Sequence, residues 1–280
     1  MRTISASDIT KKIKEACINA CLFLPKDVKE ALENARDLES REVCKDVLNQ
    51  LIENAQIAAT EEVPICQDTG FAIVFIDIGQ DVHIEGAYLI DAVNEGVRQG
   101  YLEGYLRKSI VEHPLERINT GDNTPAVIHT TIVPGEVFKV VVAPKGGGSE
   151  NMSMAKSLPP SAGSEGIIKL VAEVVKNAGS NPCPPIIVGV GIGGTVEMAA
   201  ILSKRALLRR VGESALNLID ARLESDLLDA VNNTGVGASG YGGDITALAV
   251  NVESYPCHIA SLPVAVSIQC HAARHAEFEL

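Results

Sequence analysis

The spacing of apolar residues in the N-terminal segment, about 1–60, predicts helices. Apolar side chains recur every three or four positions through 9–24, which is the period of an amphipathic helix, and Ser7-Asp8 offers an N-cap. Pro25 suits the first turn of a second helix, and the same periodicity over 41–60 predicts a third. The chain is therefore expected to begin with a helical segment.

After Pro64 the pattern changes to apolar runs that are typical of strands. The run GFAIVFIDIG (70–79) predicts a strand, and residues 86–111 have the spacing of an amphipathic helix or helix pair. Two β-rich runs then flank Pro134-Gly135, which is a strong hairpin signal. A glycine-rich run at 145–149 interrupts the pattern.

The second half of the chain alternates helical periodicity with strand-like runs. The pattern predicts helix 163–178, strand 184–191, helix 195–208, helix 220–233, and strands 246–252 and 259–268. We see no internal repeat, low-complexity segment or linker. We therefore expect one continuous α/β domain over 1–280, a mixed α+β arrangement with mixed β-sheets flanked by helices.

Charge narrows the classes of partner. The chain has 24 Lys and Arg against 36 Asp and Glu, a formal net charge of −12, so it lacks the basic surface on which nucleic-acid binding depends. No apolar run reaches the roughly 20 residues that span a bilayer, and the N-terminus lacks the apolar core of a secretory signal. We expect a cytoplasmic protein with neither nucleic acid nor membrane as partner. An anionic ligand would require positive charge concentrated locally.

The seven cysteines are expected to stay reduced, as core residues or metal ligands. Cys17 and Cys21 lie on a predicted apolar stripe, where packing in the core is the better interpretation. Cys66, Cys183 and Cys270 lie instead at the edges of β-rich runs or in Pro/Gly loops, where a side chain can be directed into a site. Their separations fit no local metal motif, so a shared metal site and three structural thiols both remain open.

Gly189, Gly191 and Gly194 have the G-x-G-x-x-G spacing between a predicted strand and a predicted helix. This is the context of a dinucleotide site, in which a helix N-terminus and bare backbone amides meet a pyrophosphate. Asp220 is a poor candidate for the acid that binds the ribose, because its surroundings predict a helix. A tight strand-to-helix turn is the alternative interpretation.

Several short motifs follow one another along the chain: ICQDTG, GYLRKS, KGGGSEN, NPCPP followed by GIGGT, GYGGDITALAV and QCHAARH. Together they resemble the α-chain of the two-subunit class I, iron–sulfur fumarases, whose architecture the related L-tartrate dehydratases share. The resemblance extends from about residue 10 to the C-terminus. It implies a hydro-lyase that catalyses reversible hydration of fumarate to (S)-malate, a step of the tricarboxylic acid cycle.

Three other functions are considered. The first is the α subunit of an L(+)-tartrate dehydratase, because malate and tartrate differ by one hydroxyl and their discrimination depends on individual pocket groups. The second is an NAD-binding oxidoreductase that uses the Gly189–Gly194 turn. The third is a non-catalytic iron–sulfur subunit whose partner performs the chemistry.

The resemblance also implies a cofactor, a [4Fe–4S] cluster held by Cys66, Cys183 and Cys270. Electron-transfer clusters ordinarily have four thiolate ligands. Three cysteines leave one iron without a protein ligand, and that open iron would act on the substrate as a Lewis acid.

Five residues are implied to contact the substrate. Gln67 and Asp68 match the family's substrate-contacting pair, and Asp68 would orient water or relay a proton. Arg107 would bind a substrate carboxylate, and Gly147 would offer a backbone amide to an oxyanion. His258 would donate to a carboxylate or carry protons, so Asp68 and His258 are the catalytic candidates. Taken without the family, Asp68 is as readily a turn acid, and Arg107 a solvated helix residue.

Other residues are expected to support the site. His271, Arg274 and His275 would set the charge around the third cysteine ligand. Lys145 would join Arg107, His258 and Arg274 in a cationic pocket for a small dicarboxylate. Cys257 receives no ligand role from the resemblance.

The family's other catalytic half does not follow in this sequence, which reaches Leu280 soon after CHAARHA. The resemblance therefore implies a β subunit as partner, and homodimerisation of the α–β pair is expected from the prevalence of two-fold symmetry.

Overall fold

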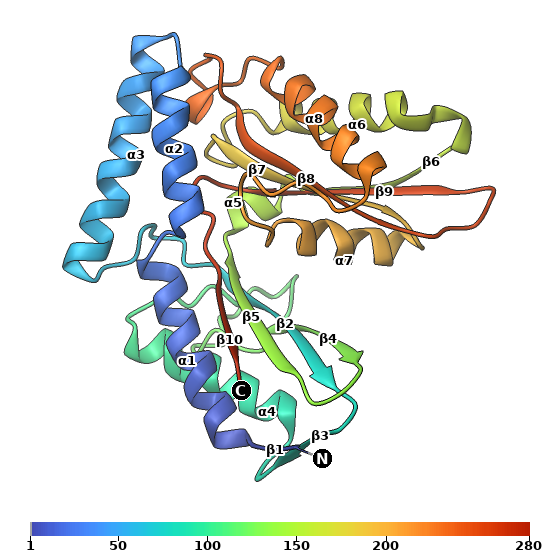
Figure 1. The fold of residues 1–280 in the computed structure, drawn as a ribbon. Coiled ribbons are helices and arrows are strands. Elements are labelled where there is room, and N and C mark those ends of the chain that lie inside the picture. Colours follow the sequence, from blue (N-terminus) through green and yellow to red (C-terminus); the bar gives the residue numbers. More distant parts are fainter. Residues whose placement is uncertain (1) are drawn as a thin grey trace. The chain divides into compact units, whose positions relative to one another are not determined.

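The computed structural model describes residues 2–280 and confirms the mixed α/β class (Figure 1). The chain forms two compact units. Unit 1 consists of the residues up to Leu24, Ala55–Gly147 and Arg274–Leu280, and unit 2 of Pro25–Asn54 and Gly148–Ala273. Each unit has its own sheet and hydrophobic core, so each is described by itself. The expectation of a single domain over 1–280 stays a prediction.

Unit 1 combines a mixed sheet with two long helices. Its elements are β1 (Arg2–Ser5), α1 (Ala6–Leu22), β2 (Phe71–Gly79), β3 (Val82–Glu85), α4 (Leu89–Glu103), β4 (Val127–Val133), β5 (Phe138–Lys145) and β10 (Ala276–Glu279). The sheet has the order β10-β5-β2-β4, and β1 pairs with β3 in a separate ladder. β2 is antiparallel to β5 and parallel to β4, and β10 is antiparallel to β5.

The predicted hairpin around Pro134-Gly135 is wrong, because β2 lies between β4 and β5 and pairs with both. The end of β2 enters the connection between those two strands, where Gly79 N–H donates to Val137 O at 2.6 Å. A Cβ at residue 79 would collide with the carbonyl of Gly135. The glycine therefore permits a close approach that a hairpin prediction, which sees only neighbouring residues, cannot anticipate.

The helices of unit 1 cross closely because glycines line their contact. A Cβ at Gly96 of α4 would lie 2.6 Å from the Cβ of Ile13, and one at Gly100 would lie 2.9 Å from the Cβ of Cys17. Cys17 and Cys21 are fully buried in this core, which confirms their predicted packing role. The N-cap of α1 is Ser5, whose Oγ accepts the N–H of Ser7, so the cap lies two residues before the predicted Ser7.

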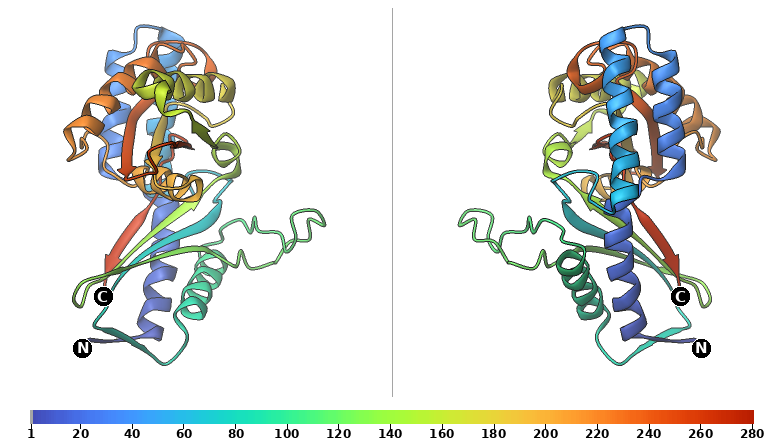
Figure 2. Two further views of the ribbon diagram at one scale, coloured as in Figure 1. Left: turned by 90° about the vertical axis from the view of Figure 1, so that its right-hand side faces the viewer. Right: turned by 90° about the vertical axis from the view of Figure 1, so that its left-hand side faces the viewer.

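Of the helix or helix pair predicted over 86–111, a single helix forms, and it ends earlier than predicted. α4 ends at Glu103, where Gly104 is the C-cap and its N–H donates to Gly100 O. Tyr105 then takes a φ of 52°, which turns the chain out of the helical path. The following residues, 105–126, which we call the strap, make a long excursion before the chain enters β4 (Figure 2). Arg107 therefore lies on the strap and not on a helix.

Unit 2 is a second mixed sheet covered by helices. Its elements are α2 (Lys26–Leu38), α3 (Glu42–Glu61, whose last turns belong to unit 1), α5 (Gly147–Glu150, whose first residue belongs to unit 1), β6 (Met154–Leu158), the short 3-10 helix η1 (Pro160–Ala162), α6 (Gly163–Ala178), β7 (Ile186–Gly193), α7 (Val196–Ala206), α8 (Leu218–Asn232), the 3-10 turn η2 (Ala238–Gly240), β8 (Ala247–Tyr255) and β9 (Leu262–Gln269). The strand order is β6-β9-β7-β8. α6 and α8 pack on one face and α7 on the other (Figure 1).

The glycines of the G-x-G-x-x-G spacing serve the packing of α7. Gly189 and Gly191 are buried in β7, where a Cβ would collide with the carbonyls of Ser203 and Ala199 respectively. Gly194 has a φ of 62° in the turn that leads from β7 to α7. The structure thus gives these glycines a structural role, in close packing of α7 on β7 and in the tight turn between them.

No helix among residues 2–280 has both the length and the apolarity that crossing a membrane requires.

Candidate functional site

One edge of the unit 1 sheet collects most of the predicted site residues. Phe71 at the start of β2 pairs with Lys145 at the end of β5, and Ala276 at the start of β10 pairs with Val142. Strand directions therefore bring three connections to the same edge: the one before β2, the one after β5, and the one before β10. They carry Cys66 to Gly70, Gly146-Gly147, and Arg274 respectively.

Asp68 is held at this edge by two backbone N–H groups. Its Oδ1 accepts the N–H of Gly70 at 3.0 Å, and its Oδ2 accepts the N–H of Gly147 at 2.8 Å. A Cβ at Gly146 would lie 3.0 Å from Oδ2, and one at Gly70, whose φ is 70°, would collide with the backbone of Lys145. Glycines in ICQDTG and KGGGSEN therefore let the backbone close around the carboxylate.

Gly147 differs from expectation in one respect. Its N–H was expected to face a substrate oxyanion, and in the structure it donates to Asp68. The residue therefore fixes the orientation of an acidic side chain.

Cys66 is half-buried and its sulfur is hydrogen-bonded. The N–H of Asp68 donates to Cys66 Sγ at 3.4 Å, and N–H groups directed at sulfur are a common feature of cluster-ligating cysteines. Cys21, by contrast, is buried, and desolvation raises the pKa of its thiol to about 11 although the charge of Arg274 opposes this. Of the described thiols in unit 1, Cys66 is the one that is reachable.

Arg274 is anchored to the same connection. Its Nη2 donates to the carbonyl of Asp68 at 2.6 Å, and the residue is 3% exposed. Tyr101 of α4, which the sequence did not single out, donates its OH to Thr69 O at 3.0 Å and Gly70 O at 3.1 Å. The available signal was a lone tyrosine on the buried face of a predicted helix, because a buried phenol requires an acceptor.

Positive charge gathers at this edge in an otherwise acidic chain. Arg107 is exposed at the beginning of the strap, where its carbonyl accepts Thr69 Oγ1 at 3.1 Å. Lys145 and Arg274 are both 3% exposed. Three of the four cations predicted to form an anion pocket therefore belong to one edge of unit 1. The fourth, His258, belongs to unit 2.

Cys183 and Cys270 lie at one end of the unit 2 sheet. Cys183 precedes β7 and Cys270 follows β9, and these antiparallel strands pair Ile187 with Gln269. The two connections contact each other, because His271 approaches the carbonyl of Cys183 with its N–H at 3.4 Å and its Nδ1 at 3.0 Å. Cys183 is exposed and Cys270 is half-buried. His271 follows Cys270 directly and contacts the carbonyl of Cys183, and its predicted influence on the charge around the third cysteine stays a prediction.

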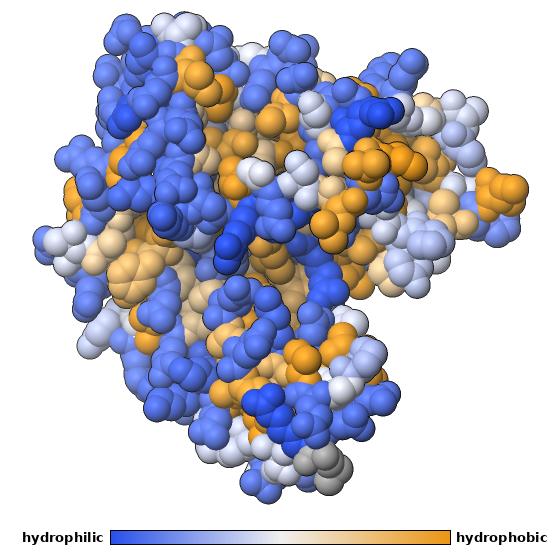
Figure 3. Space-filling view, in the orientation of Figure 1, coloured by the Kyte–Doolittle hydropathy of each residue, from blue (hydrophilic) through white to orange (hydrophobic). Residues whose placement is uncertain are grey.

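His258 lies at the opposite end of this sheet. It occurs in the connection between β8 and β9, and the whole of β9, Leu262–Gln269, separates it from Cys270. Eight strand residues span roughly 25 Å at the usual rise. His258 is exposed beside Ile259, which is 93% exposed, and Tyr255, which is 55% exposed. Figure 3 shows hydrophobic surface at the far tip of this connection.

The remaining cysteines have structural contacts. Cys44 is buried and donates its thiol to Gly242 O at 2.9 Å, and burial raises its pKa. Cys257 is exposed, and its Sγ lies 3.3 Å from Ser261 O. Within residues 2–280 no three Cys, His, Asp or Glu side chains come together as a set ready to hold a metal ion. The three proposed donors are nevertheless chemically suited to an iron–sulfur cluster, because Cys66, Cys183 and Cys270 are reachable loop thiols.

These features define a class: an α/β protein whose reachable thiols and buried cations lie in connections at the ends of strands, an arrangement suited to an enzyme that acts on a small anion. The sequence matches the fumarate hydratase (Fumerase) family over residues 10–279. The chain belongs to this family, and it is a hydro-lyase of the fumarase and tartrate dehydratase type.

Similar proteins are named as one subunit of an enzyme. A protein of Methanocaldococcus jannaschii with the provisional name L(+)-tartrate dehydratase subunit alpha is 46% identical over 274 residues, covering 96% of each chain. The L(+)-tartrate dehydratase subunit alpha of Escherichia coli O157:H7 is 34% identical over 255 residues, 90% of this chain and 84% of the relative. The protein of the same name from strain K12 has the same identity and coverage.

Proposed function

We propose that the chain is the α subunit of a [4Fe–4S] hydro-lyase that hydrates fumarate reversibly to (S)-malate. Asp68 carries this proposal, because an acid fixed by two N–H groups lies at a cationic sheet edge beside Cys66. Dehydration of L(+)-tartrate is the second candidate, and the names of the similar proteins favour it. Initial rates with both substrates, measured on the same anaerobic preparation, decide between them.

The proposed cluster ligands are Cys66, Cys183 and Cys270. All three lie in connections next to strand ends and are reachable, whereas Cys17, Cys21 and Cys44 are buried. When bound, such a cluster supplies an iron that lacks a protein ligand and polarises a substrate oxygen as a Lewis acid. Since thiolates of this kind require reducing surroundings, we place the protein in the cytoplasm.

The chain's own residues divide the remaining work. Arg107 binds a substrate carboxylate, and the charges of Lys145 and Arg274 lower the cost of holding a dianion at the edge. Gln67 is exposed beside Asp68 and donates to the substrate. Asp68 holds or accepts a proton at a carboxylate oxygen, while Gly70 and Gly147 keep it in one orientation.

We propose a β subunit as partner, because the similar proteins are named subunit alpha. The expected result is that the α chain, loaded anaerobically, turns over substrate poorly by itself and gains activity when its β chain is added. Full activity of the isolated α chain would contradict the proposal.

We also propose that two α–β pairs associate, and that His258 serves the site of the second copy. Its place at the far end of the sheet from Cys270, next to exposed Ile259 and Tyr255, supports this. Complexes that carry His258→Ala on one α chain and Arg107→Ala on the other provide the test. Random mixing makes about half of the dimers mixed, and each mixed dimer has one intact site of two. Recovery of roughly a quarter of the wild-type rate is therefore expected. Absence of recovery would overturn this part.

A further inference from the structure

Three consecutive carbonyls, those of Asp68, Thr69 and Gly70, receive hydrogen bonds from side chains. Arg274 donates to the first, and Tyr101 donates to the second and third. Asn123 Nδ2 also donates to Gly70 O at 3.2 Å. Buried backbone groups outside a ladder require such partners, and here they come from α4, the strap and the segment before β10. The connection that carries Asp68 is therefore held from three directions.

Asn123 differs from Tyr101 in that its carboxamide also accepts a hydrogen bond from the segment that carries Arg107. Its Oδ1 accepts the N–H of Ser109 at 2.6 Å, while Nδ2 donates to Gly70 O. The residue is 0% exposed and has a φ of 64°, a conformation that asparagine tolerates better than most residues. One buried side chain thus joins the connection of Asp68 to the strap two residues after Arg107.

A second hydrogen bond connects the same two segments. Thr69 Oγ1 donates to the carbonyl of Arg107 at 3.1 Å, and Thr69 is 1% exposed. The backbone at Arg107 and at the second residue after it is therefore fixed to the residues that follow Asp68. The guanidinium is exposed beyond these ties, so its base is fixed while its tip is available to a ligand.

We propose that Asn123 is a positioning residue that sets Arg107 relative to Asp68. The inference rests on the proposed function, which gives Arg107 a substrate carboxylate and Asp68 a proton. Arg107 would bind one end of a dicarboxylate. The reacting carbon then faces Asp68 only if the backbone segments that carry Arg107 and Asp68 keep a fixed distance and orientation. Misplacement by about 1 Å costs roughly 10²-fold in rate.

Hydrogen exchange tests the bridge without requiring turnover. In Asn123→Ala, amide exchange is expected to rise in both the 66–70 and the 107–109 segments. Asn123→Asp keeps the acceptor for Ser109 and lacks the donor for Gly70, so exchange should rise mainly in 66–70. Thr69→Val, an isosteric change, supplies a second variant if Asn123→Ala does not fold. Unchanged exchange at both segments in folded variants would overturn the bridge.

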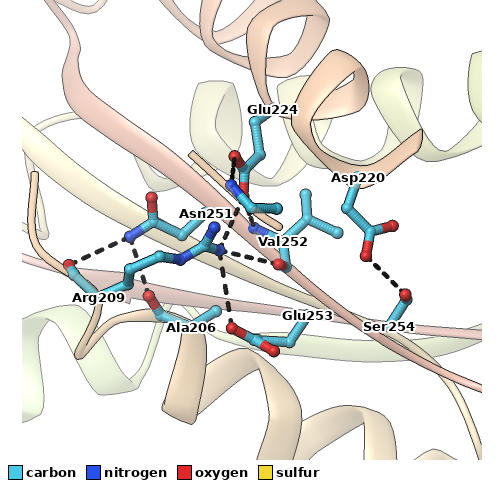
Figure 4. Close-up of polar contacts among 9 residues, drawn as sticks. Ala206, Arg209, Asp220, Glu224, Asn251, Val252, Glu253 and Ser254 are labelled. Atoms are coloured by element: carbon cyan, nitrogen blue, oxygen red, sulfur yellow. Dashed lines mark hydrogen bonds and ion pairs between the residues drawn. The ribbon is translucent and has the colours of Figure 1, made fainter. Parts of the chain in front are cut away.

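A buried asparagine in unit 2 offers a matched control. Asn251 is 3% exposed, and its Nδ2 donates to Ala206 O at 2.9 Å (Figure 4). Asn251→Ala removes a comparable buried hydrogen bond in unit 2, outside the two segments that Asn123 joins. It is expected to lower stability and to leave exchange in 66–70 and 107–109 unchanged.

Turnover of the α–β complex tests whether the bridge acts through Arg107. Asn123→Ala is expected to lower kcat/KM by about 10²-fold, mainly through a lower kcat, because substrate still binds but its reacting carbon is misplaced relative to Asp68. In an Arg107→Lys background the same change should cost less than roughly threefold, because the register no longer serves a bidentate arginine. Fully additive losses would overturn the positioning role. If the wild-type complex acts on neither substrate, the proposed function fails, and the exchange experiment still decides the bridge.

Discussion

Asp68 shows at the residue scale how segments far apart in the sequence fix one side chain. Both of its carboxylate oxygens accept backbone N–H groups, and both donors are glycines. The motif ICQDTG predicted the acid, but the donor Gly147 lies far along the chain. Only the antiparallel pairing of β2 with β5 brings the two together. The residue type was thus predictable from the sequence, and its orientation was not.

Asp68→Asn is expected to lower kcat by about 10²-fold or more, because the amide retains the shape and loses the proton acceptor. Its NH2 group would face one of the two backbone N–H donors, so stability should also fall by about 1–3 kcal/mol. Steady-state kinetics and thermal unfolding of the α–β complex provide the measurement. Asp27→Asn is the matched control, since Asp27 Oδ2 accepts the N–H of Val211 at 2.8 Å in unit 2. Turnover by Asp68→Asn at the rate of the control would contradict the assignment.

At about pH 8 the cysteines are expected to form two groups, one that is alkylated quickly and one that is protected. Burial raises the pKa of Cys17 and Cys21, so both remain protonated and protected there. Cys257, which is exposed, should react quickly in the isolated α chain. Anaerobic loading with iron and sulfide should protect Cys66, Cys183 and Cys270 and leave Cys257 reactive. Peptide mass spectrometry reads each site, and protection of Cys257 instead of Cys66 would contradict the ligand set.

At the element scale, local signals predicted helices well and strand order poorly. The helix predicted over 163–178 is α6, Gly163–Ala178, because its periodicity and its glycine boundaries are local. The hairpin prediction failed because no local signal indicates that β2 inserts between β4 and β5. Periodicity also placed Arg107 on a helix. The helix ends before it because Gly104 is the C-cap and Tyr105 turns the chain, and periodicity does not detect such a turn.

α8 is attached to the unit 2 sheet by a buried ion pair (Figure 4). Arg209 Nη2 lies 2.7 Å from Glu224 Oε1, with side chains 11% and 9% exposed. Glu224 also accepts the N–H groups of Val252 and Ala215. Glu224→Gln should lower the free energy of unfolding by about 3 kcal/mol, because Arg209 would remain buried without its close partner. Urea unfolding measures the loss.

Glu253 is the control for this pair. It lies 3.8 Å from Arg209 and its side chain is 44% exposed, and burial raises its pKa. A raised pKa means that the charged form is less favoured in the folded state, so Glu253→Gln should change stability at pH 7 by less than about 1 kcal/mol. An equal loss in both variants would show that the network is not centred on Glu224.

α4 should contribute a small pH-dependent increment to stability. Hydrogen bonds from Arg98 and Gln99 lower the pKa of Glu95 to about 2. A depressed folded-state pKa stabilises above the ordinary value of 4.5, and that stability disappears as pH falls toward 2. Glu95→Gln should therefore reduce the loss in free energy of unfolding on acidification from pH 4.5 toward 2. The reduction should be less than about 1 kcal/mol, since the side chain is 40% exposed. An unchanged loss on acidification would contradict it.

At the scale of the whole molecule, the proposed function combines a chain of net charge −12 with a locally cationic edge. Composition predicted that an anionic ligand would require such a concentration, and the strand order of unit 1 supplies it with Arg107, Lys145 and Arg274. The division into two units left no mark in composition or linkers. The place of His258 at the far end of its sheet was likewise invisible, because it follows from strand direction and not from residue type.

The central claim is that three cysteines of this chain hold one cluster with an open iron. Its most direct test is the iron and acid-labile sulfide content of the anaerobic α–β complex, with the visible spectrum recorded before and after fumarate or tartrate. The account predicts about four irons per α chain, loss of the cluster in Cys66→Ser, Cys183→Ser and Cys270→Ser, retention in Cys257→Ser, and a spectrum that shifts with substrate. A full cluster in Cys66→Ser, or a spectrum that neither substrate changes, would contradict it.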